Sequence, residues 1–221
     1  RHMEPMTIRE LLEAVNGRLL GEFNDVNRTV SRVETDSRTI HEGSLFIPLV
    51  GERFDGHAFI HDALTGGAAG CFTQRERETY LPGKFYIKVS STQKALRDLA
   101  RHYKQKFKIP FVGVTGSVGK TTTKDMVAAV LGEKFKVLKT EGNFNNEVGL
   151  PLTLLRLNRQ HELCVLEMGM NHFGEIEYLS GIVEPDVAVI TNVGDSHIEN
   201  LGSRENILKA KCEIFNHLKP N

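Results

Sequence analysis

The sequence has no tryptophan, only three cysteines and no net charge. Cys71, Cys164 and Cys212 lie far apart and lack the spacing of a metal site, so a reducing compartment is expected. Its 28 basic and 28 acidic side chains balance, which gives no reason to expect a nucleic-acid partner. No apolar run is long enough to span a bilayer, and no secretory signal is visible. These absences predict a cytoplasmic protein that does not insert into a membrane.

The composition is nevertheless that of a chain with a substantial core. Of its 221 residues, 40% are hydrophobic and 25% are charged, which suits one large or two modest domains. A helical pattern ends before Ile109-Pro110, so we expect domains over 6–108 and 109–221. Arg1-His2-Met3 is typical of a cloning tag, and the stop just after Lys219-Pro220 indicates a fragment.

The two expected domains differ in their hydrophobic pattern. The first is predicted to be a small mixed α/β domain, with strands near 18–20, 30–33, 45–49, 70–73 and 85–89. In the second, strands and helices alternate, which predicts a mainly parallel α/β sheet. Its strands are expected at 111–115, 136–139, 162–167 and 186–191, and its helices at 121–131, 149–156, 174–180 and 204–218. Such sheets bind ligands at the carboxyl ends of their strands.

The stretch "GVTGSVGKTTTKDM", residues 113–126, joins the first of these strands to the first helix. A helix start presents unpaired backbone N–H groups, and glycines let those groups approach a phosphate. Lys120 adds a full positive charge, and the Thr121 hydroxyl can bind Mg²⁺. The strict P-loop pattern has glycine where this sequence has Val114, so an off-pattern P-loop is predicted.

Two further candidates follow strands of the same sheet. Glu167 ends "ELCVLE" and could hold Mg²⁺ through its carboxylate, or be only a solvated acid. His197 follows "DVAVIT" in "TNVGDSHIENLG", where Asp195 competes for the same role. A surface histidine with no function is the alternative for His197.

Lys211 is a candidate because of its place on a helix. In "ENILKAKCEIF", Ile207, Leu208, Ile214 and Phe215 are expected to form one apolar face. Lys211 falls on that face, whereas Lys209 faces water. An inward lysine must be paired, neutralised or modified, unless its stem packs and its amine reaches solvent.

Two polar segments leave their roles open. "EGNFNNEVGLP", residues 141–151, offers the amides of Asn143, Asn145 and Asn146 either for binding or for turn formation. Residues 35–57 bring Ser37, Arg38, Arg53 and His57 into one small domain. These groups could grip a sugar nucleotide diphosphate or serve as caps and turns.

Taken in order, the motifs resemble those of the Mur ligase family. The resemblance rests on "TDSRTIHEGSLF", "GERFDGH", "GVTGSVGKTTTK", "EGNFNNEVGLP", "LEMGMNHFGEI", "TNVGDSHIENLGS" and "ILKAKCEIF", which are spread along the chain between residues 35 and 215. Within the family, "NFNNEVGLP" and "EMGMNHFGEI" favour the branch that adds D-Ala-D-Ala over the sister branch that adds the third peptide residue. The resemblance therefore implies an ATP-dependent carbon–nitrogen ligase of peptidoglycan precursor synthesis.

The resemblance also implies a reaction and roles for residues. ATP would phosphorylate the terminal carboxylate of UDP-MurNAc-tripeptide, and the amine of D-Ala-D-Ala would then displace phosphate from the acyl phosphate. Nucleotide binding would fall to Thr115, Gly116, Ser117, Val118, Gly119, Lys120, Thr121 and Thr122. Magnesium would be held by Thr121, Glu167 and His197, and the catalytic groups would be Lys120, His197 and Lys211, with Lys211 carbamylated by CO₂. Substrate binding would fall to Ser37, Arg38, Asn145, Asn146, Thr191 and Asn192.

The sequence departs from the family at its end, where the C-terminal domain expected to bind D-Ala-D-Ala is absent. We therefore expect an inactive fragment, and a monomer. Three rivals stay open: the sister ligase, a P-loop switch or small-molecule kinase, and a non-catalytic fragment that only binds a UDP-sugar.

Overall fold

A computed structural model describes residues 3–220 of the chain. The chain forms two compact units, which divide between His102 and Tyr103. This division lies inside helix α3 (Thr92–Lys104), earlier than the residue 108 expected from the sequence, and the assignment of domains 6–108 and 109–221 stays a prediction. The predicted tag residues Arg1 and His2 lie outside the described residues. Among residues 3–220, no helix combines the length and the apolar character that crossing a bilayer requires.

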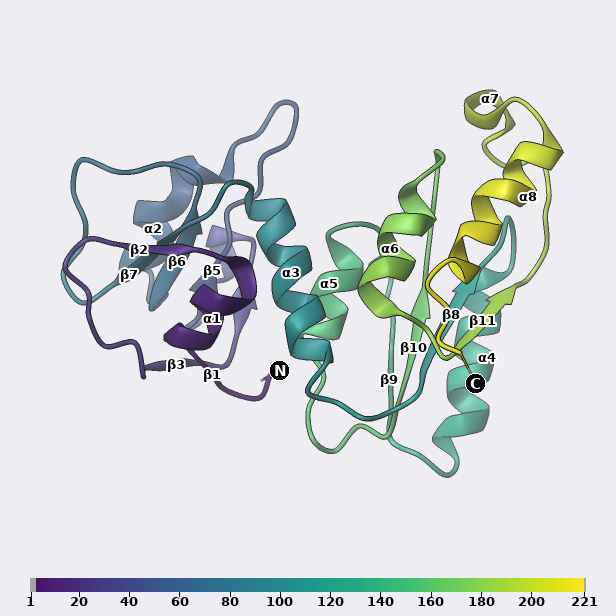
Figure 1. Cartoon of the computed structure of the whole chain (residues 1–221), viewed down its shortest axis with the longest axis horizontal. Coiled ribbons are helices and arrows are strands. Elements are labelled where there is room, and N and C mark those ends of the chain that lie inside the picture. Colours follow the sequence, from purple (N-terminus) through teal and green to yellow (C-terminus); the bar gives the residue numbers. More distant parts are fainter. Residues whose placement is uncertain (1–2, 221) are drawn as a thin grey trace. The chain divides into compact units, whose positions relative to one another are not determined.

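The first unit is built on a five-stranded mixed sheet in the order β2-β7-β6-β5-β4 (Figure 1). Only the β2–β7 pair is antiparallel. A separate antiparallel pair joins β1 to β3. The strands are β1 (Met6–Thr7), β2 (Arg18–Leu20), β3 (Thr29–Val30), β4 (Val33–Glu34), β5 (Leu45–Phe46), β6 (Gly70–Thr73) and β7 (Phe85–Lys88). The helices are α1 (Ile8–Val15), α2 (Ile60–Thr65) and α3, with 3-10 turns at Ser37–Thr39 and Gly56–Phe59. This arrangement confirms the predicted small mixed α/β fold.

One strand of this unit differs from the sequence prediction. The run expected as a single strand at 30–33 is divided between β3 and β4, which belong to different sheets. The carbonyl of Ser31 accepts a hydrogen bond from the N–H of Met3, whereas the next carbonyl, that of Arg32, accepts one from Leu45. Because neighbouring carbonyls serve different partners, the chain leaves one sheet and enters the other within these two residues.

The second unit carries a four-stranded, fully parallel sheet in the order β11-β8-β10-β9. This confirms the parallel α/β architecture predicted from the alternating pattern. The strands are β8 (Phe111–Thr115), β9 (Val137–Lys139), β10 (Leu163–Glu167) and β11 (Val187–Ile190). The helices are α4 (Lys120–Gly132), α5 (Gly149–Leu154), α6 (Glu175–Val183), α7 (Ile198–Leu201) and α8 (Arg204–Cys212), with a 3-10 turn at Glu213–Phe215.

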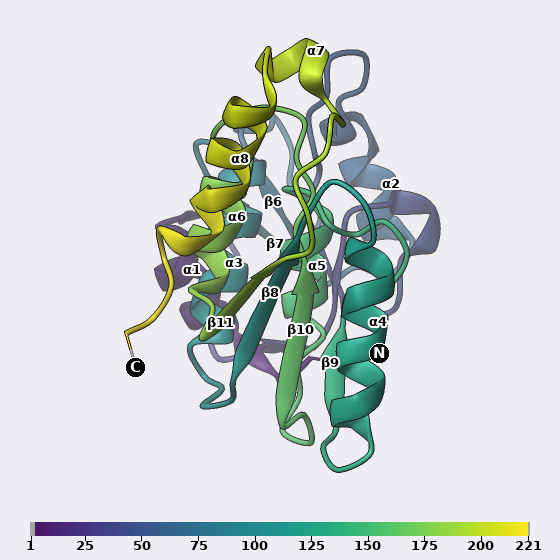
Figure 2. The same ribbon diagram turned by 90° about the vertical axis from the view of Figure 1, so that its right-hand side faces the viewer.

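Helices cover both faces of the parallel sheet. Helix α4 lies along one face, and α6 and α8 lie on the other (Figure 2). Val112 and Val114 of β8 pack with Ala128 of α4 in one hydrophobic cluster. Gly113 points the other way, toward Ile214 of the 3-10 turn after α8, because successive residues of a strand face opposite sides. The central strand is therefore buried on both faces.

This topology brings several loops to one edge. β8 lies between β10 and β11, so the chain segments that follow these three strands leave the sheet side by side. In register, Glu167 of β10 pairs with Val114, and Ile190 of β11 pairs with Thr115. The segments after Thr115, Glu167 and Ile190 thus meet at the carboxyl edge, where parallel sheets bind their ligands.

Candidate functional site

The glycine-rich loop runs from Gly116 to Gly119, between the end of β8 and the first residue of α4. Both glycines have positive φ, +155° at Gly116 and +80° at Gly119, a region that favours residues without a Cβ. Helix α4 begins at Lys120, and its first N–H groups have no partner within the helix. The predicted order of strand, loop and helix is confirmed, and the loop presents a helix start to the carboxyl edge.

Thr121 and Glu167 form the polar centre of this edge. The Thr121 hydroxyl lies 3.1 Å from both carboxylate oxygens of Glu167. The side-chain amide of Asn145 donates to Glu167 Oε1 at 3.2 Å. Glu167 is only 2% exposed, although Thr121 is exposed. A hydroxyl, a carboxylate and an amide from three separate segments therefore converge beside the helix start.

Two residues that the sequence analysis did not single out hold Glu167 in place. The Thr140 hydroxyl accepts a hydrogen bond from the backbone N–H of Glu167 at 2.9 Å. The buried amine of Lys124 donates to the Thr140 carbonyl at 2.8 Å and forms an ion pair with Asp125. Lys124 lies four residues before the buried Ala128 on the face of α4 that covers the sheet. That helical spacing was the sequence signal that could have identified it.

Thr191 and Asn192, directly after β11, bind the glycine-rich loop. The Asn192 side-chain oxygen accepts from the N–H groups of Ser117 and Val118 at 3.1 and 3.0 Å. Its side-chain nitrogen donates to the Val118 carbonyl at 2.8 Å, and the Thr191 hydroxyl donates to the same carbonyl at 2.8 Å. The Ser117 hydroxyl in turn accepts from the N–H of Gly194 at 2.8 Å. The two predicted substrate-binding residues thus contact the loop, and their contact with a peptide stays a prediction.

Lys211 of α8 is turned inward, as its helical position predicts. It is 2% exposed, whereas Lys209 is exposed. Burial, and then the nearby charge of Lys120, lowers the pKa of the Lys211 amine to about 8. The prediction that Leu208 and Phe215 belong to the apolar face of this helix is wrong, because these side chains are 46% and 44% exposed. The buried face comprises Ile207, Ala210, Lys211 and Ile214, which follow one another by three- and four-residue steps, so Leu208 and Phe215 fall one residue beyond it.

His197 follows β11 and is exposed. It adopts φ = +66° just before α7, and none of the described contacts joins its imidazole to Thr121 or Glu167. Asp195, its competitor in the sequence analysis, forms two hydrogen bonds with Arg204 at 3.0 and 3.1 Å. Within residues 3–220 no three His, Cys, Asp or Glu side chains are grouped closely enough to hold a metal ion. The metal-binding role of His197 stays a prediction.

Two other predicted residues have structural partners. The Asn146 side-chain oxygen accepts from the N–H groups of Val148 and Gly149 at 3.2 and 2.8 Å, at the start of α5. Thr115 is fully buried, and its hydroxyl donates to the Met168 carbonyl at 2.8 Å. These hydrogen bonds order the loops at the carboxyl edge, whatever further contacts the two residues make with ligands.

In the first unit, Ser37 and Arg38 lie in a 3-10 turn capped by Asp36. The Arg38 guanidinium donates twice to the Asp36 carboxylate, at 3.0 and 2.9 Å, and holds the pKa of Asp36 down at about 2. His57, by contrast, is buried. Its Nε2 accepts from the N–H of Gln74 at 2.9 Å, so its Nδ1 donates to Asp55 at 2.8 Å. His57 therefore has a structural role, whereas the Arg38 guanidinium stays exposed.

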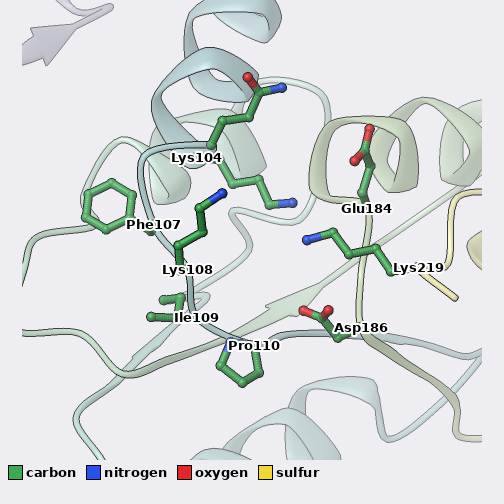
Figure 3. A pocket seen from close by; sticks show the side chains of 9 residues that line it. Lys104, Phe107, Lys108, Ile109, Pro110, Glu184, Asp186 and Lys219 are labelled. Carbon is green, nitrogen blue, oxygen red and sulfur yellow. The ribbon is translucent and has the colours of Figure 1, made fainter. Parts of the chain in front are cut away.

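The second unit also has a pocket of about 460 Å³, shown in Figure 3. Lys104 and Lys219 point their amines toward each other there, and burial followed by the Lys219 charge lowers the pKa of Lys104 to about 8. Lys108 precedes β8, and Glu184 and Asp186 precede β11. The pocket thus lies at the amino ends of the strands, away from the loop at the carboxyl edge.

Comparison with known proteins agrees with this geometry. Residues 114–221 match the family model described as "Mur ligase middle domain", and residues 29–104 match "Mur ligase family, catalytic domain". UDP-N-acetylmuramoyl-tripeptide--D-alanyl-D-alanine ligase from Bacillus subtilis (strain 168) is 47% identical over 213 residues, covering 96% of this chain and 46% of that protein.

Solved structures give the same result. The crystal structure of MurF from Acinetobacter baumannii matches with a TM-score of 0.92 at 36% identity, covering 99% of this chain and 48% of that one. MurF ligase from Thermotoga maritima, solved in complex with ADP, matches with a TM-score of 0.79 at 42% identity, covering 86% and 44%. The chain thus spans about half the length of the relatives it matches. In both of its units, the chain belongs to the Mur ligase family.

Proposed function

We propose that this chain forms the first two domains of an ATP-dependent ligase that joins D-Ala-D-Ala to UDP-MurNAc-tripeptide in the cytoplasm. The relatives that carry this activity in their names are about twice as long, so the remaining contacts to D-Ala-D-Ala would come from the segment that they have in addition. The two units described here would supply the binding of the UDP-linked substrate and of ATP.

The observation that carries the proposal is the pairing of Thr121 with Glu167 beside the start of α4. The N–H groups of a helix start favour an anion, and Lys120 places a full positive charge at the same point. A loop of this kind suits the phosphates of ATP. Positioning and charge neutralisation dominate phosphoryl transfer, so few groups need to take part in covalent chemistry.

The donor set at this edge also fits magnesium. Mg²⁺ prefers oxygen ligands and keeps several of its waters, and a hydroxyl with a carboxylate supplies the oxygens that it needs. Thr121 and Glu167 would hold the ion, with His197 as a proposed third participant. When bound, the ion would neutralise charge on the phosphates. Asn145 would keep the Glu167 carboxylate oriented, since its amide already donates to that group.

The UDP-linked substrate is proposed to bind the first unit through Ser37 and Arg38. Arg38 has an 86% exposed side chain and a planar guanidinium, which suits a diphosphate. Its pairing with Asp36 fixes the direction of that guanidinium.

Separate titrations of this chain with UDP-MurNAc-tripeptide and with Mg-ADP test the proposal. We expect calorimetry to show binding of both. A P-loop kinase would bind only the nucleotide, and a bare UDP-sugar-binding fragment would bind only the sugar nucleotide. Binding of only one of the two ligands would contradict the ligase proposal and favour the corresponding rival. The sister ligase is a further rival, and the test of it needs a protein of the relatives' full length. D-Ala-D-Ala and single amino acids are offered to that protein as competing amine donors, and the donor that it joins shows which ligase it is.

We further propose that Lys211 is carbamylated by CO₂. Its amine is buried beside Lys120, so a carbamate anion there would replace the repulsion of two cations by an attraction. CO₂ reacts with the neutral amine, and the neutral fraction grows as pH rises through about 8. Carbamate should therefore be more abundant at about pH 8 than at about pH 6, where the amine is protonated.

Carbon-13 NMR of the chain in ¹³C-bicarbonate measures this directly. We expect a carbamate resonance that grows between about pH 6 and pH 8 and is lost in Lys211→Gln. Lys209→Gln, on the exposed side of the same helix, is the matched control and should keep the resonance. A resonance that survives Lys211→Gln, or none at the higher pH, would rule out the modification.

A further inference from the structure

The loop between β8 and α4 is held by an asparagine from another strand end. One side chain, Asn192, meets two consecutive N–H groups and one carbonyl of the loop, all within 3.1 Å. A carboxamide carries an acceptor oxygen with two lone pairs and a separate NH₂ donor, so it can bind two N–H groups and one carbonyl at once. The contact joins segments 74 residues apart in the chain, so it is a tertiary contact and not a local turn.

The geometry divides the loop into two parts. The N–H groups of Ser117 and Val118 are bound to Asn192, whereas those of the first helical turn, from Lys120 on, have no partner within α4. Thr191 strengthens the division, because its hydroxyl also donates to the Val118 carbonyl, so two side chains occupy that acceptor. A carbonyl facing a phosphate would repel it, so binding Val118 in this way favours an anion at the helix start.

We propose that Asn192 is a positioning residue that holds the glycine-rich loop in its nucleotide-binding shape and stays in place when a nucleotide binds. The expected effect on nucleotide binding rests on the proposed function, whereas the contact between Asn192 and the loop does not. Without this clamp by the Asn192 side chain, Val118 would lose the acceptor of its N–H and one of the two donors to its carbonyl, and only the Thr191 hydroxyl would still hold it. Preorganisation of this kind raises affinity because the ordering cost is met before the ligand arrives.

Amide hydrogen exchange tests the clamp without any ligand. In Asn192→Ala we expect the Val118 amide to exchange at least about tenfold faster than in the unchanged chain, since it loses its acceptor. The Ser117 N–H keeps a second acceptor, the backbone carbonyl of residue 192 at 3.3 Å, so its exchange should change less. Mg-ADP should bind about tenfold more weakly to the same variant, because the loop must then be ordered on binding. Asn216→Ala, which removes an exposed amide that donates to Glu177, is the matched control and should change neither quantity.

A conservative variant separates positioning from general damage. Asn192→Asp keeps a side-chain acceptor for the Val118 N–H, so slow exchange at Val118 should return. Nucleotide binding should remain weak in this variant, since a carboxylate beside the loop repels phosphate. Loss of protection in Asn192→Asp as well as in Asn192→Ala would contradict the proposed pairing.

The unchanged chain gives a test that does not depend on any variant folding. Protection of the Ser117 and Val118 amides should persist when Mg-ADP is added, and its loss would show that the nucleotide displaces Asn192 and would overturn the proposal. Equal exchange and equal affinity in Asn192→Ala and the unchanged chain would overturn it too. If the unchanged chain bound no Mg-ADP, the proposed function would fail while the exchange measurement would still decide the clamp.

Discussion

Gly116→Ala is expected to damage both the fold of the second unit and nucleotide binding. A Cβ at residue 116 would lie 1.8 Å from the Thr191 hydroxyl, far inside any real contact, and the backbone there has φ = +155°. Strain of this kind should lower the free energy of unfolding by about 1–3 kcal/mol. Relief of the overlap requires the loop to move or the Thr191 hydroxyl to leave the Val118 carbonyl, and either change disturbs the loop, so Mg-ADP affinity should fall at least about tenfold. Denaturant unfolding and calorimetric titration measure the two effects.

Gly132→Ala is the matched control for this substitution. Gly132 ends α4, has nothing within 4 Å of an added Cβ and does not have a positive φ. Alanine there should leave stability unchanged or raise it by up to about 1 kcal/mol. Adding Thr191→Ala to Gly116→Ala removes the overlapping hydroxyl and should restore part of the lost stability. A Gly116→Ala protein as stable as the Gly132→Ala protein would show that this close approach is not present.

Glu167→Gln should remove the magnesium dependence of nucleotide binding while leaving the fold intact. Glutamine has nearly the same shape as glutamate and can still accept from Thr121 and Asn145, so the melting temperature should change little. It lacks the charge that a divalent ion needs. Loss of partners that only orient a metal ligand costs about 10- to 100-fold in metal affinity, so loss of the ligand's charge should cost at least that much.

The measurement is the affinity for ADP in the presence and in the absence of magnesium, in Glu167→Gln and in Glu162→Gln. Glu162 lies just before the amino end of β10, where it accepts from the N–H of Lys136, and so provides a control next to the same strand. We expect magnesium to strengthen binding in the control but not in Glu167→Gln. If magnesium strengthened binding equally in both proteins, Glu167 would not be a metal ligand.

Much of the second unit could be predicted because its signals are local. The apolar run that ends in Phe111–Thr115 is buried on both faces, and its hydrophobic pattern alone identified the central strand. The inward position of Lys211 followed from helical spacing in the same way. The short strands β3 and β4 were joined in the prediction because the change of sheet at Ser31 and Arg32 depends on partners distant in sequence.

The arrangement of the site depended on such distant partners even more. The sequence placed Glu167 and the loop at one edge, and helical spacing could have marked Lys124 as inward. No pattern indicated that the Thr140 hydroxyl binds the Glu167 N–H or that Lys124 binds the Thr140 carbonyl. Nor did the sequence show that Asn192 binds the loop, because an asparagine directly after a strand could equally contact a ligand. Side-chain hydrogen bonds between separate strand ends have no periodicity, so composition and spacing do not reveal them.

The measurement that tests the central claim most directly is calorimetric titration of Mg-ADP into Lys120→Ala. If the glycine-rich loop and the start of α4 hold the phosphates, removing this amine should weaken binding by about 2 kcal/mol or more, roughly 30-fold. Lys134→Ala, beyond the far end of the same helix, should bind as the unchanged chain does. Lys120→Ala affinity within about twofold of the unchanged chain would contradict the account, because the nucleotide would then bind elsewhere.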